Sequence, residues 1–424
     1  MKTNFSKILW LVVLLITISF CACTESSSAD KSTSTGISSF WITHVRLDID
    51  SSTVFTIDET NALIYNYDSL PYQSPKDSFI PTIMGYLLSA VYINDSIEYS
   101  GSDTIDFSNL VKLTSYAENG ENNQTYRVEV RVHSVDPDLY IWQKAGGNIY
   151  TETPLEEKAY FFNGQIYLFV RTATDAYLYR STDAKTWQKE TITLPLTATF
   201  QKIIKTATGF LVVDNNNLYE TTDGIRWTNS TLTTSLSYLL FELNKKIYAL
   251  GNDNSIYETS DKIQWNSVAS APSNFPIKGA AINVSYTPNG QAHAYVAGGE
   301  TANGDFLSTV WSTDNGSYWT ELTEGINYFT PRSGASIIQY DGMLMLFGGK
   351  DKNGVVSDPH WISSNYGLVW KRPSAKIILS FDFQSRFDQS VIIDDNLGIY
   401  IVGGRNFGYF MNNVWTGKKI EFTF

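Results

Sequence analysis

The sequence contains almost no cysteine: of its 424 residues only Cys21 and Cys23 are cysteines, and both lie close to the N-terminus. Disulfide bonds therefore cannot hold the rest of the chain together. Its 26 Tyr, 23 Phe and 11 Trp provide apolar surface for a packed core instead. This composition excludes a disordered, collagen-like or coiled-coil protein, and the length allows two or three domains.

Positive charge is also scarce. The chain has 31 Lys and Arg residues against 43 Asp and Glu residues, which gives a formal net charge of -12. A nucleic-acid-binding protein needs a basic surface to neutralise phosphate groups. We therefore expect no nucleic-acid partner.

Common catalytic and metal-binding motifs are missing from the sequence. The four histidines are isolated and none precedes Glu, so His-Glu-x-x-His does not occur: His44, His133, His293 and His360. Nor does the sequence contain Gly-x-Ser-x-Gly, Gly-x-x-x-x-Gly-Lys or Gly-x-Gly-x-x-Gly. The polar segments that begin at Asp214 and Asp351 lack a full acidic calcium loop and predict hairpin turns. We expect no metal site and no cofactor.

The N-terminus has the layout of a secretory signal peptide. Within residues 1–22, two lysines precede an apolar run from Ile8 to Ile16 that is too short to span a bilayer. The following Phe-Cys-Ala-Cys resembles a bacterial lipobox, which implies cleavage after Ala22 and lipidation of Cys23. The alternative is an ordinary cleaved signal peptide with Cys23 as a free thiol. Residues 23–36, and the polar run as far as Ser39, predict a flexible tether.

Residues 37–135 predict a first β domain. Tyr126, Val128, Val130 and Val132 alternate with charged residues and His, which indicates a strand with one buried face. A turn cluster around Gly120 precedes this strand, and no convincing amphipathic helix occurs. The segment from Asp106 to Val130 resembles the final strands of the Ig-like domains of bacterial surface proteins, which implies a small Ig-like β-sandwich.

An internal repeat fills the rest of the chain. Its unit is an aromatic residue, a Ser/Thr-rich turn that usually contains Asp, and a closing Trp. The five complete copies are Tyr179–Trp187, Tyr219–Trp227, Tyr257–Trp265, Trp311–Trp319 and Trp361–Trp370. The closing Trp residues are 40, 38, 54 and 51 positions apart. Such periods, with several short strands in each repeat, predict an all-β fold in which residues 137–424 form a β-propeller.

The two ends of the repeat array complement each other. Val414 and Trp415 open a sixth copy, but no closing Trp follows them. Upstream, Trp142-Gln-Lys repeats Trp187-Gln-Lys. We therefore expect the strand at residues 139–144 to complete a sixth blade and close the ring, which leaves no free sheet edge. The alternative is five blades and a fragment, with Trp142 in a linker.

Two families resemble this repeat. The segment from Ser312 to Trp319 is similar to the Asp-box of sialidase-like propellers, and Gly298-Gly299, Gly348-Gly349 and Gly403-Gly404 resemble kelch repeats. Because these elements are structural in those families, the resemblance gives four aspartates a role in turn hydrogen bonds and none in catalysis: Asp183, Asp223, Asp261 and Asp314. Together with the lipobox and the Ig-like segment, the chain resembles a bacterial lipoprotein family with domain of unknown function 6242, whose propeller has no established activity.

The candidate ligand-binding residues are Lys278, Arg332 and Arg386. The two arginines precede their Gly pairs by 16 and 17 residues, so all three residues are expected to lie where an innermost strand begins. In kelch propellers that bind acidic peptides, an Arg of this type lines the channel mouth. The resemblance therefore implies recognition of an anionic group. The alternative is that the three residues pair with local acids such as Asp388.

These features favour a binding protein without catalysis. We expect a lipid-anchored, monomeric protein of the bacterial outer membrane, on its periplasmic side or at the cell surface, whose propeller face binds an envelope protein or a glycan. Exposed aromatic residues are candidates for stacking on sugars: Tyr366, Phe407, Tyr409 and Phe410. Two alternatives are a glycoside hydrolase with paired carboxylates at the channel mouth and a structural spacer. A sialidase is disfavoured because its Arg-Ile-Pro signature is missing.

Overall fold

The computed structural model describes residues 30–44, 53–323, 329–355 and 360–420. The expected signal peptide, Cys23 and most of the expected tether lie outside these residues. The described chain is almost entirely β-structure, which confirms the all-β prediction, with one short 3-10 helix, η1 (Phe200–Lys202). In this part of the chain no helix is long and apolar enough to cross a membrane. The chain divides into unit 1 (Met1–Asp136) and unit 2 (Pro137–Phe424).

Unit 1 contains a two-stranded sheet, β1-β4, and a six-stranded sheet in the order β2-β3-β8-β7-β5-β6. The strands are β1 (Ile37–His44), β2 (Phe55–Asp58), β3 (Leu63–Asn66), β4 (Phe79–Gly85), β5 (Leu88–Ile93), β6 (Ile97–Glu98), β7 (Val111–Ala117) and β8 (Asn123–Glu129). One apolar core joins both sheets. Its members include Tyr126 and Val128 of β8, each 1% exposed, so burial follows the alternation in the sequence.

Part of the expected tether is folded onto unit 1. The backbone N–H of Ser32 donates to Glu118 (3.0 Å), and the Ser115 hydroxyl donates to the carbonyl of Thr35 (2.6 Å). Strand β1 begins at Ile37, which is 3% exposed. The prediction of a tether as far as Ser39 is therefore wrong. A polar sequence does not prevent ordering, because backbone groups pair whatever side chains they carry.

Unit 2 is built from sheets whose strands mostly follow one another along the chain. Sheet 1 contains β10 (Glu156–Phe162), β11 (Gln165–Arg171), β12 (Ala176–Ser181) and β13 (Gln188–Thr191). Sheet 2 contains β14 (Ile204–Thr206), β15 (Gly209–Asp214), β16 (Asn217–Thr221) and β17 (Thr228–Thr231). Sheet 3 contains β18 (Leu236–Leu243), β19 (Lys246–Gly251), β20 (Ser255–Thr259) and β21 (Asn266–Ser270).

The remaining sheets complete the described part of unit 2. Sheet 4 contains β22 (Ala281–Tyr286), β23 (Ala292–Ala297), β24 (Val310–Thr313) and β25 (Thr320–Glu321). Sheet 5 contains β26 (Ser336–Tyr340), β27 (Met343–Phe347) and β30 (His360–Ser363). Sheet 6 contains β31 (Ser390–Ile393), β32 (Ile399–Val402), β35 (Val414–Lys419) and β9 (Tyr140–Ala145). Two hairpins extend from sheets 5 and 6: β28 (Lys350–Asp351) with β29 (Gly354–Val355), and β33 (Arg405–Asn406) with β34 (Tyr409–Phe410).

The first strands of the sheets form a closed circle. β14 contacts β18, β18 contacts β22, β22 contacts β26, β26 contacts β31, and β31 contacts β10; β10 contacts η1, which leads into β14. This circular order is that of a β-propeller, as the repeat predicted. Apolar side chains fill the space between neighbouring sheets.

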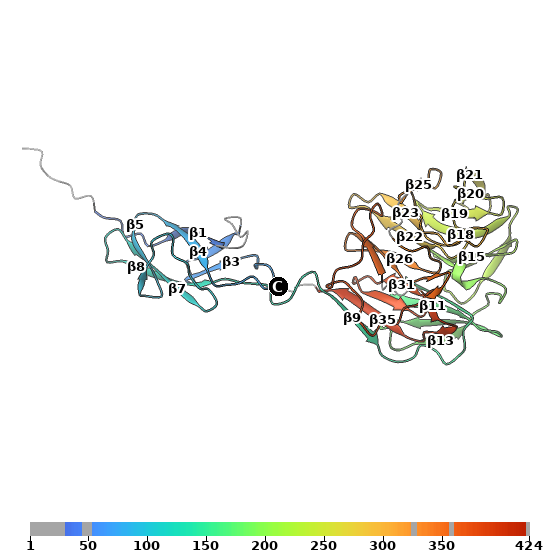
Figure 1. The fold of residues 1–424 in the computed structure, drawn as a ribbon, viewed down its shortest axis with the longest axis horizontal. Helices are drawn as coiled ribbons and strands as arrows, with labels where there is room; N and C mark the ends of the chain where they lie inside the picture. The colour runs from blue at the N-terminus through green and yellow to red at the C-terminus, as the bar shows by residue number, and fades with distance from the viewer. Residues whose placement is uncertain (1–29, 45–52, 324–328, 356–359, 421–424) are drawn as a thin grey trace, which may run out of the picture. The chain divides into compact units, whose positions relative to one another are not determined.

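Strand β9 joins the two ends of unit 2. It pairs antiparallel with β35, so that Trp142 lies opposite Gly417 and Lys144 lies opposite Trp415 (Figure 1). The indole N–H of Trp142 also donates to the carbonyl of Ile377 (2.9 Å). The outer strand of sheet 6 therefore comes from the segment that precedes sheet 1.

Strand direction defines two opposite faces of unit 2. Because the sheets are antiparallel, the loops between second and third strands lie on the side where the first strands begin, which we call the start face. The turns between third and fourth strands lie on the other side, which we call the turn face.

The repeat turns occupy the turn face. The Oδ1 atoms of Asp183, Asp223 and Asp261 each accept two backbone N–H bonds at 2.8–2.9 Å. In sheet 4 the acceptor is Asn315, not Asp314: its Oδ1 receives the N–H groups of Ser317 (2.9 Å) and Tyr318 (3.0 Å). The prediction for Asp314 is therefore wrong by one position.

Candidate functional site

Arg332 and Arg386 lie at the start face but are enclosed, with 0% and 1% exposure. The Nη1 atom of Arg332 donates to Gly348 O (3.0 Å) and its Nε to Thr330 O (3.0 Å). Arg386 repeats the arrangement: Nη1 donates to Gly403 O (2.9 Å) and Nε to Gln384 O (3.0 Å). The expectation that these guanidinium groups face a ligand is therefore wrong, because both side chains are buried and backbone carbonyls accept from Nη1 and Nε of each.

Lys278 is the one of the three predicted residues that is accessible. Its Nζ lies 2.8 Å from Glu300 Oε2, with side-chain exposures of 56% for Lys278 and 11% for Glu300. Burial opposes ionisation of Glu300, but hydrogen bonds from Lys278 and Ser333 outweigh it and lower its pKa. The alternative of pairing with a local acid thus describes Lys278. Asp388 pairs instead with Arg405, whose Nε donates to its Oδ2 (2.8 Å).

The Gly pairs allow the buried arginines and their neighbours to approach the backbone. Gly403 has φ +60, and a Cβ atom there would lie 2.1 Å from Glu157 Oε1. Gly348 has φ +61, and a Cβ atom there would lie 2.3 Å from Arg386 O. Only glycine suits both this conformation and this spacing.

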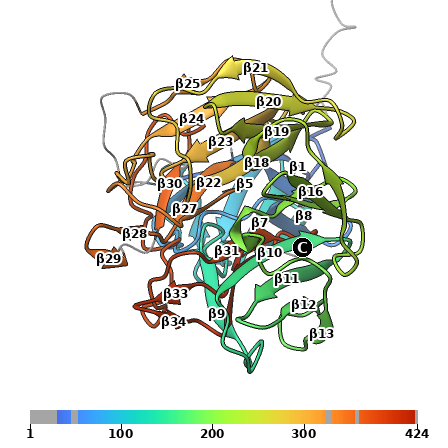
Figure 2. The ribbon, with the colours of Figure 1, turned by 90° about the vertical axis from the view of Figure 1, so that its right-hand side faces the viewer.

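Two hairpins that follow Gly pairs carry exposed side chains on the start face. In the β33–β34 hairpin, Phe407 is 78% and Tyr409 is 77% exposed. Phe407 Cε1 would lie 3.6 Å from a Cβ on Gly354, so this hairpin lies beside the β28–β29 hairpin (Figure 2). Two large aromatic side chains thus face solvent beside the circle of first strands.

Three lysines of the start face make no ion pair with any described residue: Lys158, Lys202 and Lys350. Each is half-buried. Burial lowers the pKa of Lys158, while the charge of Asp388 partly offsets it, and burial likewise lowers the pKa of Lys202. The structure therefore places three half-buried lysines at the start face that no sequence motif indicated.

Two hydrogen bonds and one cation–π contact link the segments that carry these lysines. Gln201, next to Lys202, donates through Nε2 to the carbonyls of Glu157 (2.5 Å) and Asp388 (3.1 Å). Phe387, next to Asp388, has the Lys350 Nζ 5.3 Å from its ring centre. The three lysines thus come from β10, η1 and the β28–β29 hairpin.

The carboxylates at the start of the first strands all have partners. Glu156 forms an ion pair with Arg171 (3.0 Å), Glu300 with Lys278, and Asp388 with Arg405. Glu157 is 2% exposed, and its two oxygens accept the Tyr150 hydroxyl (2.8 Å) and the Gly404 N–H (2.5 Å). Burial raises the pKa of Glu157 to about 7 despite these hydrogen bonds.

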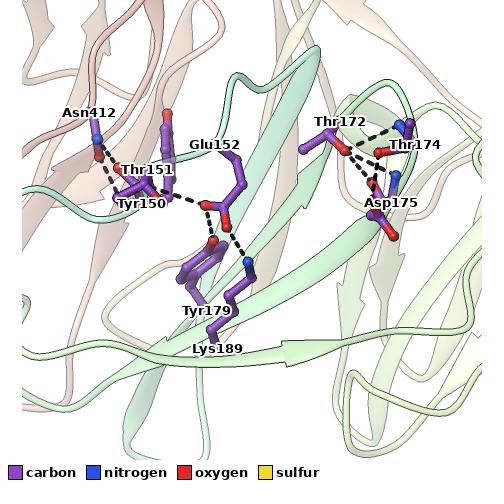
Figure 3. Close-up of polar contacts among 9 residues, drawn as sticks. All are labelled: Tyr150, Thr151, Glu152, Thr172, Thr174, Asp175, Tyr179, Lys189 and Asn412. Atoms are coloured by element: carbon purple, nitrogen blue, oxygen red, sulfur yellow. Dashed lines mark hydrogen bonds and ion pairs between the residues drawn. The ribbon is translucent and has the colours of Figure 1, made fainter.

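The connector between β9 and β10 carries a further polar cluster (Figure 3). Glu152 accepts hydrogen bonds from the Tyr179 hydroxyl (2.5 Å) and from Lys189. Burial opposes ionisation of Glu152, but these bonds outweigh it and lower its pKa to about 2. Asn412, in the loop before β35 of sheet 6, accepts the N–H of Tyr150 (3.0 Å). This cluster fastens the connector to sheets 1 and 6.

Family models match both units. The model described as the DUF6242 beta propeller domain matches residues 136–424, and the DUF6242 N-terminal domain, a domain of unknown function, matches residues 27–130. No curated protein matches the chain. Among solved structures the chain is similar to "Structure of YjhT", with 15% identity and a TM-score of 0.46 over 63% of this chain and 94% of that one. The two family matches together show that the chain belongs to the DUF6242 family.

Proposed function

We propose that this protein is a monomeric, lipid-anchored binding protein of the bacterial outer membrane. In this proposal Cys23 carries the lipid, residues 37–135 form an Ig-like sandwich, and sheets 1 to 6 are the blades of a six-bladed propeller. The lipobox-like sequence around Cys23, the two-sheet core of unit 1 and the closed circle of first strands support these assignments.

The ligand site is the start face, and its ligand is an envelope protein or a glycan. The observation that carries this assignment is the pair of exposed aromatic side chains on the β33–β34 hairpin, Phe407 and Tyr409. Aromatic rings that face solvent, on the same face as an accessible cation, Lys278, provide apolar contact area and charge. Buried aromatic residues elsewhere in unit 2 form the cores between sheets and have no such role.

Binding without catalysis fits the state of the carboxylates. A retaining or inverting glycosidase needs a protonated acid and a second carboxylate that both reach the glycosidic bond. Glu156, Glu300 and Asp388 form ion pairs with Arg171, Lys278 and Arg405 respectively, and the pKa of Glu300 is lowered by its hydrogen bonds with Lys278 and Ser333. Glu300 is therefore unsuited to donate a proton, and the other two carboxylates are engaged by arginines within the protein.

A glycoside hydrolase is the second candidate, and Glu157 is the observation that favours it. A pKa of about 7 is suitable for a general acid. However, Glu157 is enclosed and both its oxygens accept internal hydrogen bonds, so a substrate would reach it only after a rearrangement. We therefore rank hydrolysis below binding.

The test is a binding screen of the full chain in a neutral detergent against glycans and envelope proteins. The variant F407A/Y409A is compared with Y318A, because Tyr318 is 79% exposed but lies on the turn face. We expect the first variant to lose a binding partner that Y318A retains. Equal binding by all three proteins would refute the assignment to the start face, and release of sugar that E157Q abolishes would favour the hydrolase.

A further inference from the structure

A pocket of about 270 Å³ lies on the turn face between sheets 2 and 3, and we call it the junction pocket. Its lining residues come from the β14–β15 turn, from strands β15 and β16, and from the repeat turns of both sheets. We propose that the junction pocket binds one uronic acid residue of a glycan, with Arg226 holding the carboxylate of the sugar. This site is separate from the start face and does not rest on the function proposed for that face.

Tyrosine rings fill the corresponding space at other junctions between sheets. In sheets 1, 3 and 4 the second strand places Tyr167, Tyr248 or Tyr295 against the turn of the following sheet. A Cβ atom on the turn glycine of that following sheet would lie 3.2, 2.0 and 3.7 Å from these rings respectively. In sheet 2 the equivalent residue is Leu211, since it also pairs with the residue before the capping Ser or Thr. Leucine is smaller than tyrosine, and Leu211 lines the junction pocket.

The repeat turn of sheet 3 also differs from its neighbours. In sheets 1 to 4 the residue after the turn Asp or Asn has a positive φ, which disfavours large side chains. Sheet 3 has a lysine at this position, where two of the other sheets have glycine and one has alanine. A conformation that disfavours the residue present indicates that its side chain has a role. The four residues are Ala184 (φ +59), Gly224 (φ +79), Lys262 (φ +66) and Gly316 (φ +73).

Two contacts hold the walls of the junction pocket together. Lys262 forms an ion pair with Glu220 of β16, and so connects the turn of sheet 3 to sheet 2. The N–H of Ala207, in the β14–β15 turn, donates to Glu242 of β18 (2.6 Å). Because the walls are held in this way before a ligand binds, binding orders few additional groups.

The polar groups of the junction pocket suit a sugar. The side chains of Thr208, Thr222 and Thr228 line it, and their hydroxyl groups form no hydrogen bond with any described residue. Such hydroxyl groups both donate to and accept from the hydroxyl groups of a sugar ring. Glu220 adds a carboxylate acceptor on the same wall.

Arg226 provides the group that recognises an acid. Its guanidinium lines the junction pocket and forms no ion pair with any described residue, whereas Glu220 already balances Lys262. Asp223, the nearest acid in the sequence, directs its Oδ1 to the backbone N–H groups of residues 225 and 226. A guanidinium fork binds a planar carboxylate through two parallel hydrogen bonds. The acidic group of the ligand is therefore a carboxylate.

The size of the junction pocket limits the ligand to one ring. Pockets that enclose a drug-sized molecule usually measure about 300–1,000 Å³, so a smaller pocket suits a single sugar residue. Thr222, Arg226 and Thr228 are exposed, so the pocket opens to solvent. A glycan chain can therefore continue out of it on either side of the bound residue.

Titration of the full chain with methyl glucuronide, in neutral detergent and followed by NMR of the ligand, tests the site. The methyl group blocks the sugar where a glycan chain would continue, and methyl glucoside is the matched ligand without the carboxylate. We expect methyl glucoside to bind about tenfold more weakly, and R226M to weaken methyl glucuronide binding about tenfold, the effect of one charge-assisted hydrogen bond. R127M, which replaces an exposed arginine of unit 1, should leave binding unchanged.

Three results of this titration would overturn the proposal: no binding of methyl glucuronide, equal binding of methyl glucoside, or equal binding by R226M and R127M. The variant F407A/Y409A separates this inference from the proposed function, because it should bind methyl glucuronide as the original protein does. Loss of methyl glucuronide binding in F407A/Y409A would place the sugar site on the start face and overturn the inference.

The variant L211Y/K262G tests the junction pocket itself. It restores the tyrosine and glycine found at the other junctions, so we expect it to fold, with a melting temperature no lower than that of the original protein. It should not bind methyl glucuronide, because the tyrosine ring fills the pocket. Unchanged binding would overturn the assignment to this pocket, and a lower melting temperature would overturn the argument from the missing tyrosine.

Discussion

Glu157 should make the protein less stable as the pH rises from about 4.5 to about 7. Its carboxyl group is enclosed at the junction of sheets 1 and 6, where burial raises its pKa from 4.5 to about 7. Below pH 4.5 both the folded and the unfolded chain carry the proton. Between the two pKa values only the folded chain keeps it, so the free energy of unfolding falls with increasing pH. Above pH 7 the carboxyl group is ionised in both states, and the full free-energy cost of burying its charge is reached.

The difference between the two pKa values corresponds to about 3 kcal/mol. E157Q replaces the carboxyl group with an amide that does not ionise and has a similar shape. Its carbonyl oxygen accepts the Gly404 N–H, and its NH2 group donates to the Tyr150 hydroxyl in place of the reverse bond. We therefore expect E157Q to be more stable than the original protein above pH 7, by up to about 3 kcal/mol, and equally stable near pH 4.

Urea denaturation at a series of pH values measures this difference. E152Q is the matched control, because hydrogen bonds from Lys189 and Tyr179 outweigh burial and lower the pKa of Glu152 to about 2. Glu152 therefore contributes stability that is present above pH 4.5 and is lost as the pH falls toward 2, so E152Q should destabilise the protein at pH 7. Parallel stability profiles of E157Q and the original protein between pH 5 and 8 would refute the reasoning.

The remaining predictions concern the structural framework, and urea denaturation at pH 7 measures all three. N315A should lower the free energy of unfolding by about 1–2 kcal/mol, because two backbone N–H groups lose their acceptor. D314A should change it by no more than about 0.5 kcal/mol. The reverse order would restore the Asp-box assignment of Asp314. R386A should cost about 3 kcal/mol because it leaves buried carbonyls without donors, and a smaller effect than that of N315A would contradict this. G403A should cost more than G408A, since both have positive φ but only Gly403 lacks space for a Cβ; similar losses would argue against close packing around Glu157.

The propeller was predictable because each copy of its repeat forms a turn from residues that are close in sequence. In each copy two side-chain oxygens cap the same turn. One is the hydroxyl of a Ser or Thr, and the other belongs to an Asp carboxylate or an Asn amide, as at Thr221 and Asp223. In three copies the closing indole also donates to a turn carbonyl, as Trp227 does to Gly224 (3.2 Å). Such a turn depends only on residues that are close in sequence, so a single chain reveals it.

The error at Asp314 came from the same pattern. The acceptor side chain lies four residues before the closing Trp in sheets 1 to 3, as with Asp183 and Trp187. Four residues before Trp319 is Asn315, whereas Asp314 is five residues before it. The residue type favours Asp314, but spacing decides the acceptor, because an amide oxygen accepts the same bonds as a carboxylate. Counting back from the Trp would have found the correct residue.

The arginines show the limit of a spacing argument. Intervals of 16 and 17 residues to the Gly pairs placed Arg332 and Arg386 at the beginning of a first strand. The same intervals separate each arginine from the carbonyl that it binds, Gly348 and Gly403. The regular spacing therefore reflected an internal hydrogen bond. Whether a guanidinium turns inward depends on packing in three dimensions, which the sequence does not specify.

Equivalent positions in the sheets nevertheless contain a usable signal. The residue after each Gly pair is Glu300, Lys350 or Arg405, and each pairs with the segment before a first strand. The framework repeats its Gly pairs, whereas this adjacent position changes its charge from sheet to sheet. In two of the sheets this charge serves an internal ion pair, because Glu300 pairs with Lys278 and Arg405 pairs with Asp388. In these two sheets the residue after the Gly pair therefore indicates the opposite charge on the segment that precedes the first strand.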